Sequence, residues 1–154
     1  MAPEGVQIDA VREEDLEELL PLVRAYCDFY AVAPPDGPLL TMCRALLDNP
    51  DHEGVQLIAR APGGRAVGFA TIFWTWSTLS AARIGIMNDL YVASDARGGG
   101  VAEALISACR ERCRELGARW LSWQTAKDNV RAQRVYERVG ARREEWVDYS
   151  LEVT

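Results

Sequence analysis

The stretch from Arg97 to Ala102 reads Arg-Gly-Gly-Gly-Val-Ala and stands directly before a run with helical spacing of apolar residues. Glycines weaken a helix start, because glycine loses more backbone entropy on ordering than other residues. A bare backbone at a helix N-terminus can instead hold an anion, and Arg97 adds a charged fork for phosphate. The pattern predicts a phosphate or pyrophosphate cradle, and the alternative is a tight strand-to-helix turn without a ligand.

Two common nucleotide loops do not fit this stretch. A nucleoside-triphosphate loop needs a Lys-Ser/Thr pair after its last glycine, and no such pair follows here. A dinucleotide fingerprint places Gly or Ala where this chain has Glu103, and it opens a parallel unit instead of following an antiparallel meander. Both of these interpretations therefore fail on their context.

The elements around the loop follow from hydrophobic periodicity. Alternation predicts strands at 6–11, 55–61, 66–76, 84–92, 118–125 and 144–153. Helical spacing predicts a helix ending near Tyr30 that Pro21 kinks or splits, and further helices at 39–47, from the glycine loop to Leu116, and from Asp128 or Asn129 to Gly140. Gly117 is the expected C-terminal cap of the third helix. This order predicts an α/β (α+β-like) fold, a mixed sheet with an antiparallel meander.

Composition and charge limit the function classes. The 154 residues suit one domain, and no apolar run is long enough to span a membrane or to form a signal peptide, so we expect a cytoplasmic protein. The net charge of −6 argues against nucleic acid and mildly favours a cationic substrate, although it also serves plain solubility. The cysteines lack a CxxC pair, and with one histidine they predict buried free thiols and no metal site. They are Cys27, Cys43, Cys109 and Cys113.

Two segments, NDLYVASDARGGGVAEALI and DNVRAQRVYERVGA, resemble the Gcn5-related N-acetyltransferase family. The family's loop pattern R/Q-x-x-G-x-G/A is matched by Arg97, Gly100 and Ala102. The combination of NDLYV with AQxxY is similar to the branch that acetylates polyamines, free amino acids and basic protein tails. The resemblance implies a single domain over 1–154, helices on both faces of the sheet, and acetyl transfer from acetyl-CoA to a small-molecule or peptidyl amine. The alternative is an acyl-CoA-binding or sensing domain without turnover.

The resemblance also implies where acetyl-CoA binds. Strands 84–92 and 118–125 would splay apart, and the pantetheine arm would bond to strand backbone in the gap. The pyrophosphate would lie on the glycine loop, and the start of the last helix would contact the pantetheine. The residues concerned are Leu90, Tyr91, Val92, Arg97, Gly98, Gly99, Gly100, Val101, Ala102, Asn129, Ala132 and Tyr136.

Amine acetylation needs an amine that has lost its proton, donors for the oxyanion and a proton for the leaving thiolate. Tyr136 lies two helical turns after Asn129 and can donate that proton. Spacing alone favours a core tyrosine, whereas the match to AQxxY favours the catalytic role. Asn88 cannot act as a base but can hold a water or orient the amine. Asp89 would face the other side of its strand unless a bulge intervenes, so we expect proton loss through water or to a carboxylate not yet placed.

Aromatic residues are candidates for the acceptor pocket, although ordinary core packing explains each of them equally well. Tyr30 and Trp74 are the predicted substrate contacts, and Tyr26, Phe29 and Trp76 are further candidates. The apolar last strand, Trp146 to Val153, would leave an open edge or face. We therefore also expect a homodimer.

Overall fold

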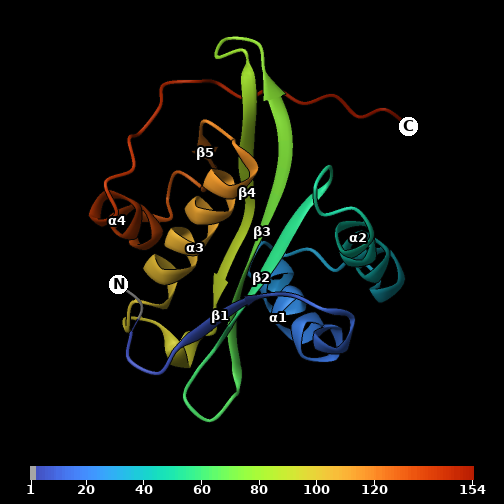
Figure 1. Cartoon of the computed structure of the whole chain (residues 1–154), viewed down its shortest axis with the longest axis vertical. Helices are drawn as coiled ribbons and strands as arrows, with labels where there is room; N and C mark the ends of the chain where they lie inside the picture. The colour runs from blue at the N-terminus through green and yellow to red at the C-terminus, as the bar shows by residue number, and fades with distance from the viewer. Residues whose placement is uncertain (1–2) are drawn as a thin grey trace. The chain divides into compact units, whose positions relative to one another are not determined.

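The computed structural model describes residues 3–154, which form one compact unit up to Gln124 and a second from Thr125 to Thr154. The first unit holds five strands and three α-helices, and the second holds α4 (Figure 1). In chain order the elements are β1 (Gln7–Ala10), α1 (Leu16–Phe29), α2 (Asp36–Asp48), β2 (Gly54–Arg60), β3 (Ala66–Ser77), β4 (Ala82–Val92), α3 (Val101–Leu116), β5 (Leu121–Ser122) and α4 (Val130–Arg138). Short 3-10 turns occupy Glu13–Asp15 and Ser94–Ala96.

The strands form one sheet in the order β1-β2-β3-β4-β5. The first four strands pair antiparallel in sequence order, and β5 joins β4 in parallel. The predicted mixed sheet with an antiparallel meander is therefore confirmed.

Helices cover both faces of this sheet (Figure 1). On one face, Leu19 of α1 and Cys43 of α2 belong to a core with Ile58 and Phe69. On the other face α3 lies so close that a Cβ atom on Gly85 would stand 2.6 Å from the sulfur of Cys113. The helix is amphipathic as predicted, and Gly117 caps it with a φ of 82°.

The four cysteines are free thiols. Cys43, Cys109 and Cys113 are buried as predicted, and Cys27 is half-buried. Burial raises the pKa of Cys109 to about 12 and that of Cys113 to about 11, so both stay protonated and unreactive at neutral pH.

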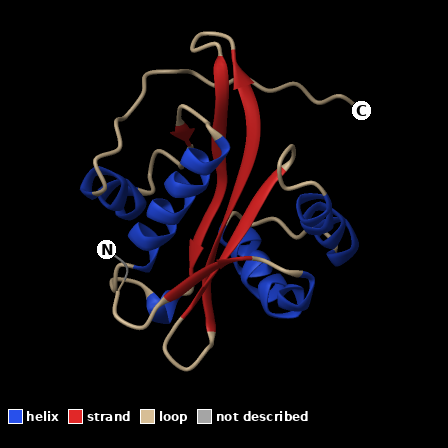
Figure 2. Cartoon of the chain, in the orientation of Figure 1, coloured by secondary structure: helices blue, strands red, loops and turns tan. Residues whose placement is uncertain are grey.

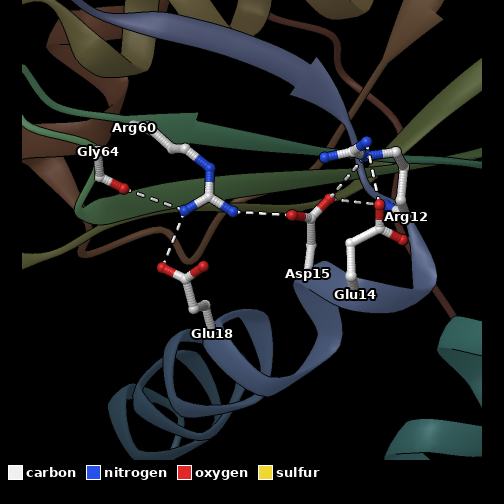
Figure 3. A network of polar contacts seen from close by, with 6 residues as sticks. All are labelled: Arg12, Glu14, Asp15, Glu18, Arg60 and Gly64. Carbon is white, nitrogen blue, oxygen red and sulfur yellow. Dashed lines mark hydrogen bonds and ion pairs between the residues drawn. The ribbon is translucent and has the colours of Figure 1, made fainter.

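A network of polar contacts fixes the start of α1 against β2. Arg60 donates from Nη2 to Oδ1 of buried Asp15 and from Nη1 to Oε2 of Glu18, each at 2.8 Å. The second Asp15 oxygen accepts the backbone N–H of Arg12 at 2.8 Å, which closes the first turn. Figure 3 shows this network together with Glu14 and Gly64.

Several predicted element bounds were wrong. Of the two effects predicted for Pro21, the split does not occur, because α1 runs unbroken through it, and α2 begins at Asp36 instead of Leu39. The strand predicted at 118–125 shrinks to Leu121–Ser122, because the chain leaves β4 after that pair. No strand is assigned at 144–153, which Figure 2 colours as loop, because alternation makes a strand only where a partner strand is present.

Candidate active site

A β-bulge in β4 separates Asn88 from its neighbours. Asp89 pairs with Thr71 and Met87 pairs with Ile72, so Asn88 has no counterpart on β3. The extra residue places Asp89 and Met87 on opposite faces although they stand two positions apart. Strand alternation predicts that Asp89 faces the other side of β4 from its expected site unless a bulge intervenes, and the structure has that bulge. Asp89 therefore shares a face with Thr71, on the side covered by α1.

Asp89 is the buried carboxylate at this bulge, with 8% of its surface exposed. Its Oδ1 accepts a hydrogen bond from Nδ2 of Asn88 at 3.1 Å, and the hydroxyls of Thr71 and Tyr26 also reach the carboxylate. Burial raises the pKa of Asp89 above its ordinary value, and the three hydrogen bonds oppose that rise only in part. A carboxylate with a raised pKa is the type of group that takes up a proton near neutral pH.

Tyr26 of α1 connects this carboxylate to a group of exposed aromatics. Its hydroxyl donates to the carbonyl of Asn88 at 3.3 Å, and burial together with the charge of Asp89 raises its pKa well above the usual range. Tyr26 thus remains a protonated donor. Its ring lies 5.2 Å from that of Tyr30, and the Tyr30 ring lies 5.1 Å from Phe29. These two outer rings are 42% and 55% exposed, so an aromatic path leads from solvent toward Asp89.

The other edge of β4 is open beside the bulge. Strand β5 pairs with β4 only at Gly85 and Ile86. From Met87 onward, which includes Leu90, Tyr91 and Val92, the ladder pairs of β4 are with β3. Arg97 folds back over this end of the strand, with Nε donating to the Val92 carbonyl at 2.8 Å and the guanidinium 5.5 Å from the Tyr91 ring. The backbone of β4 from Met87 to Val92 therefore has no ladder pair with β5, and the splay that the resemblance implies stays a prediction.

The glycine loop has the geometry of an open helix start. Gly98 and Gly100 have φ values of 81° and 87°, in the left-handed region that favours glycine. Gly99 has an ordinary φ, and the nearest atom to an added Cβ would lie 3.9 Å away. Gly100 is the N-cap of α3 and brings no side chain to it, so the first-turn amides of Val101 and Ala102 are not capped by Gly100. The turn needs two of the three glycines, and the third leaves open space above the backbone.

The second unit carries the remaining predicted residues. The Asn129 side chain caps α4 by accepting the amide of Ala132 at 3.3 Å, as predicted. Tyr136 is half-buried in a row with Ala132, Val135 and Val139. The row has the spacing of an apolar helix face, and Asn129 and Tyr136 lie two turns apart on one helix side.

The structure does not bring Trp74 to Asp89. Trp74 and Thr71 lie on opposite faces of β3 because they stand three positions apart on a regular strand, and the indole N–H donates to the Pro50 carbonyl at 2.8 Å. Trp76 is 70% exposed and stacks with Arg83.

Sequence reasoning missed two buried polar residues, Thr71, which contacts Asp89, and Gln56, which contacts Thr71. The Thr71 hydroxyl reaches Asp89 and accepts from Nε2 of Gln56 at 3.1 Å, and both residues are buried. Each could have been found from the sequence as a polar residue flanked by apolar ones, Gln56 in β2 and Thr71 in β3.

Comparison with known proteins agrees with this geometry. The model of the acetyltransferase (GNAT) family matches residues 19–141. The chain belongs to the GNAT acetyltransferase family. It is 34% identical over 149 residues to the uncharacterized N-acetyltransferase YhfO of Bacillus subtilis, covering 96% of this chain and 98% of that protein. It is 31% identical over 140 residues to the D-amino-acid N-acetyltransferase HPA3 of Saccharomyces cerevisiae, covering 90% and 86%.

Solved structures give the same result for the GNAT fold. A crystal structure of a probable acetyltransferase superposes with a TM-score of 0.84 at 31% identity, covering 96% of this chain and 98% of that one. The aminoglycoside acetyltransferase AAC(6')-Iy, in complex with a bisubstrate analogue, shares the fold with a TM-score of 0.84 at 23% identity, covering 97% and 99%. The chain is therefore an enzyme of the N-acetyltransferase class.

Two further findings concern metals and membranes. Among residues 3–154 no three His, Cys, Asp or Glu side chains come together as a metal-binding group. None of the described helices is long and apolar enough to cross a membrane.

Proposed function

We propose that this enzyme transfers the acetyl group of acetyl-CoA to the primary amine of a small molecule or peptide. The observation that carries the proposal is the bulge of β4, which presents a buried carboxylate of raised pKa beside a strand edge without a ladder partner. Within this class we favour polyamines, amino acids and basic protein tails. The D-amino-acid acetyltransferase relative and the net charge of −6 support an amine that arrives as a cation.

The residues present fit acetyl-CoA, which would supply the acetyl thioester. The open space at Gly99 and the amides at the start of α3 suit its pyrophosphate, and Arg97 adds positive charge. The free edge at Leu90 to Val92 suits the amide groups of the pantetheine arm. Asn129 and Ala132 at the start of α4 are proposed as further contacts of that arm.

In the proposed reaction Asp89 is the base and Tyr136 is the acid. The carboxylate accepts one proton of the substrate ammonium, directly or through one water, and the freed nitrogen forms the bond to the acetyl carbon. The C–S bond breaks, and Tyr136 donates its phenolic proton to the sulfur. The second proton of the nitrogen restores the Tyr136 phenol through water, and the proton held by Asp89 passes to solvent, so that the net products are the amide, the free thiol and one proton. Tyr26 stays protonated and holds the Asn88 carbonyl, while Asn88 orients the amine.

The acceptor is proposed to enter along the aromatic side chains of α1. Phe29 and Tyr30 offer exposed ring faces to a cation or to an apolar body, and Tyr26 leads from them to Asp89. Trp74 stays a prediction as a substrate contact, and its position across the sheet assigns it no part in this path. We further propose that the enzyme works in the cytoplasm as a homodimer, without nucleic acid or membrane partners.

An amine panel tests the proposed function. Release of free CoA thiol from acetyl-CoA is followed with a thiol reagent, and mass spectrometry identifies the acetylated product. We expect release that depends on the amine and a product heavier by one acetyl group. A protein that binds acetyl-CoA but gives no amine-dependent release with polyamines, amino acids or basic peptides would contradict the proposal and favour a sensing domain.

A further inference from the structure

Three buried polar side chains stand opposite one another on neighbouring strands of the sheet. In the strand register, Gln56 of β2 pairs with Thr71 of β3, and Thr71 pairs with Asp89 of β4. Their exposed fractions are 3%, 0% and 8%. Side chains directly opposite one another on neighbouring strands point to the same face and lie within contact distance. The three therefore form a continuous polar row across the face of the sheet that α1 and α2 cover.

The polar row lies in apolar surroundings. Ile58 and Phe69 form the next pair along β2 and β3 on the same face, and both belong to the buried hydrophobic core with α1 and α2. A polar side chain in such a place costs free energy unless it is hydrogen-bonded, and an apolar side chain of the same shape can pack as well. Core packing alone therefore does not explain three polar residues in succession, and their common end point is Asp89.

The hydrogen bonds of the polar row run in one direction. Nε2 of Gln56 donates to the hydroxyl oxygen of Thr71 at 3.1 Å. A hydroxyl has a single hydrogen, and the Thr71 hydroxyl bonds to the Asp89 carboxylate, which can only accept when it is ionised. Because the Thr71 oxygen already accepts from Gln56, it is less able to accept a bond from protonated Asp89. The row therefore favours the ionised carboxylate over the carboxylic acid.

A second contact holds the Gln56 amide in this orientation. Burial raises the pKa of the Cys43 thiol in α2, and the Gln56 side chain opposes that rise, as a hydrogen bond donated to sulfur does. An amide nitrogen carries two hydrogens, so Gln56 can donate to the Thr71 oxygen and to the Cys43 sulfur at once. Gln56 is thereby fixed between α2 and β3, with its donor nitrogen toward Thr71.

Other titratable and charged groups face Asp89 from the elements packed around it. They are Tyr26 and Cys27 of α1, Cys43 of α2, Tyr91 of β4 and Arg97, whose guanidinium lies 5.5 Å from the Tyr91 ring. Burial is the largest cause that raises the pKa of Tyr26, Cys27 and Cys43, so these three stay neutral while Asp89 titrates. Arg97 stays charged throughout. A change in the titration of Asp89 can therefore be traced to the polar row.

We propose that Gln56 and Thr71 are positioning residues for Asp89: Gln56 directs the hydrogen of the Thr71 hydroxyl onto the carboxylate, which holds it ionised and in one orientation at the bulge. Both residues act through Asp89 and not on the substrate. The inference rests on the proposed function, because it concerns the group that takes the proton of the amine. A carboxylate held in this way remains available as a base at lower pH than one without the row.

Titration of the Asp89 carboxyl carbon by NMR tests the polar row without turnover, and the signal that Asp89→Asn lacks assigns it. Thr71→Val keeps the side-chain shape and removes the hydroxyl. It should move the midpoint to higher pH, because the ionised form loses a hydrogen bond. Gln56→Met should give a smaller shift in the same direction, and Thr71→Ser should restore a midpoint near that of wild type.

Thr75→Val is the matched control, because it makes the same change on β3 at an exposed position and should leave the midpoint of Asp89 where it is. A Thr71→Val midpoint that equals the wild-type value, or that moves to lower pH, would overturn the proposal. Gln56→Met leaves β3 unaltered and gives an independent result. A Gln56→Met midpoint equal to that of wild type would overturn the part assigned to Gln56.

The pH profile of kcat/KM for the fastest amine of the panel separates this inference from the proposed function. On the acidic limb Thr71→Val should lose ~10-fold in kcat/KM, whereas on the plateau it should stay closer to wild type. A structural defect would instead lower both parts of the profile alike, and that result with an unmoved NMR midpoint would overturn the positioning role. A moved NMR midpoint with an unmoved acidic limb would uphold the polar row and contradict Asp89 as the base.

Discussion

Asp89 shows at the residue scale how a backbone irregularity creates chemistry. Only the bulge at Asn88 places this carboxylate beside Tyr26 and Thr71 on the face covered by α1. Burial raises its pKa, which makes it a better proton acceptor at neutral pH than a surface aspartate. The same burial lowers the stability of the folded protein when Asp89 is ionised.

We expect Asp89→Asn to stabilise the folded protein at neutral and higher pH. Because the folded pKa lies above the ordinary 3.8, ionised Asp89 costs stability once the pH exceeds the unfolded pKa. The neutral amide carries no such cost, so its advantage should be smallest below about pH 4 and grow through the folded pKa. Urea unfolding of both proteins across pH measures this difference. A variant whose disadvantage grows with pH would contradict the assigned shift.

Tyr136→Phe removes one oxygen and little volume from α4. If Tyr136 protonates the leaving thiolate, kcat should fall by ~10²-fold or more while acetyl-CoA affinity is retained. Tyr149→Phe is the matched control, because Tyr149 is 93% exposed and should tolerate the change. A folded Tyr136→Phe enzyme with near-normal kcat would remove Tyr136 from the mechanism.

The glycine loop and the helix start behind it act at the element scale. Gly98 and Gly100 make the turn into α3, and Gly99 keeps the space above it clear. The loop was recognisable from the sequence because glycine at a helix start has few purposes. The bulge was not recognisable, because an inserted residue shows only in the pairing of two strands. Thr71 and Gln56 were missed for the same reason, since the hydrogen bonds from Gln56 to Thr71 and between Thr71 and Asp89 depend on how β2, β3 and β4 pair.

Gly99→Glu should weaken acetyl-CoA binding at least ~10-fold in calorimetry, a loss of about 1.4 kcal/mol. The side chain enters open space at an ordinary φ, so the added negative charge acts without backbone strain. Gly99→Ala fills the same position without charge and should bind nearly as well as wild type. Equal affinity for the glutamate and alanine variants would place the pyrophosphate elsewhere.

The network at the start of α1 should matter for stability and not for turnover. Arg60→Met leaves buried Asp15 with only the longer ion pair to Arg12, at 3.7 Å, and should lower the free energy of unfolding by about 2 kcal/mol. Arg65→Met is the control, because its pair with Asp95 is more than half exposed and should contribute less than about 1 kcal/mol. Urea unfolding gives both values, and equal losses would contradict the role of burial.

At the scale of the whole molecule, local pattern predicted the fold more reliably than it predicted partners. The meander follows from alternation within the strands and the helices follow from helical spacing, whereas the place of helices on both faces was implied by the family resemblance. The segment 144–153 has equally clear alternation, yet the chain alone forms no strand there. A strand forms only where a partner strand lies beside the segment, and the pattern of one segment does not show whether such a partner is present. The excess of 23 acidic over 17 basic side chains fits the proposed cationic amine substrate, and it does not indicate how copies of the chain assemble.

The pH dependence of kcat/KM for a primary amine, in wild type and in Asp89→Asn, tests the central claim most directly. The account predicts that wild-type kcat/KM falls as the pH drops through the raised pKa of Asp89. It also predicts that Asp89→Asn is at least ~10²-fold slower and lacks that limb, although it still binds acetyl-CoA. An Asp89→Asn enzyme with the wild-type rate and the wild-type profile would show that the proton goes elsewhere.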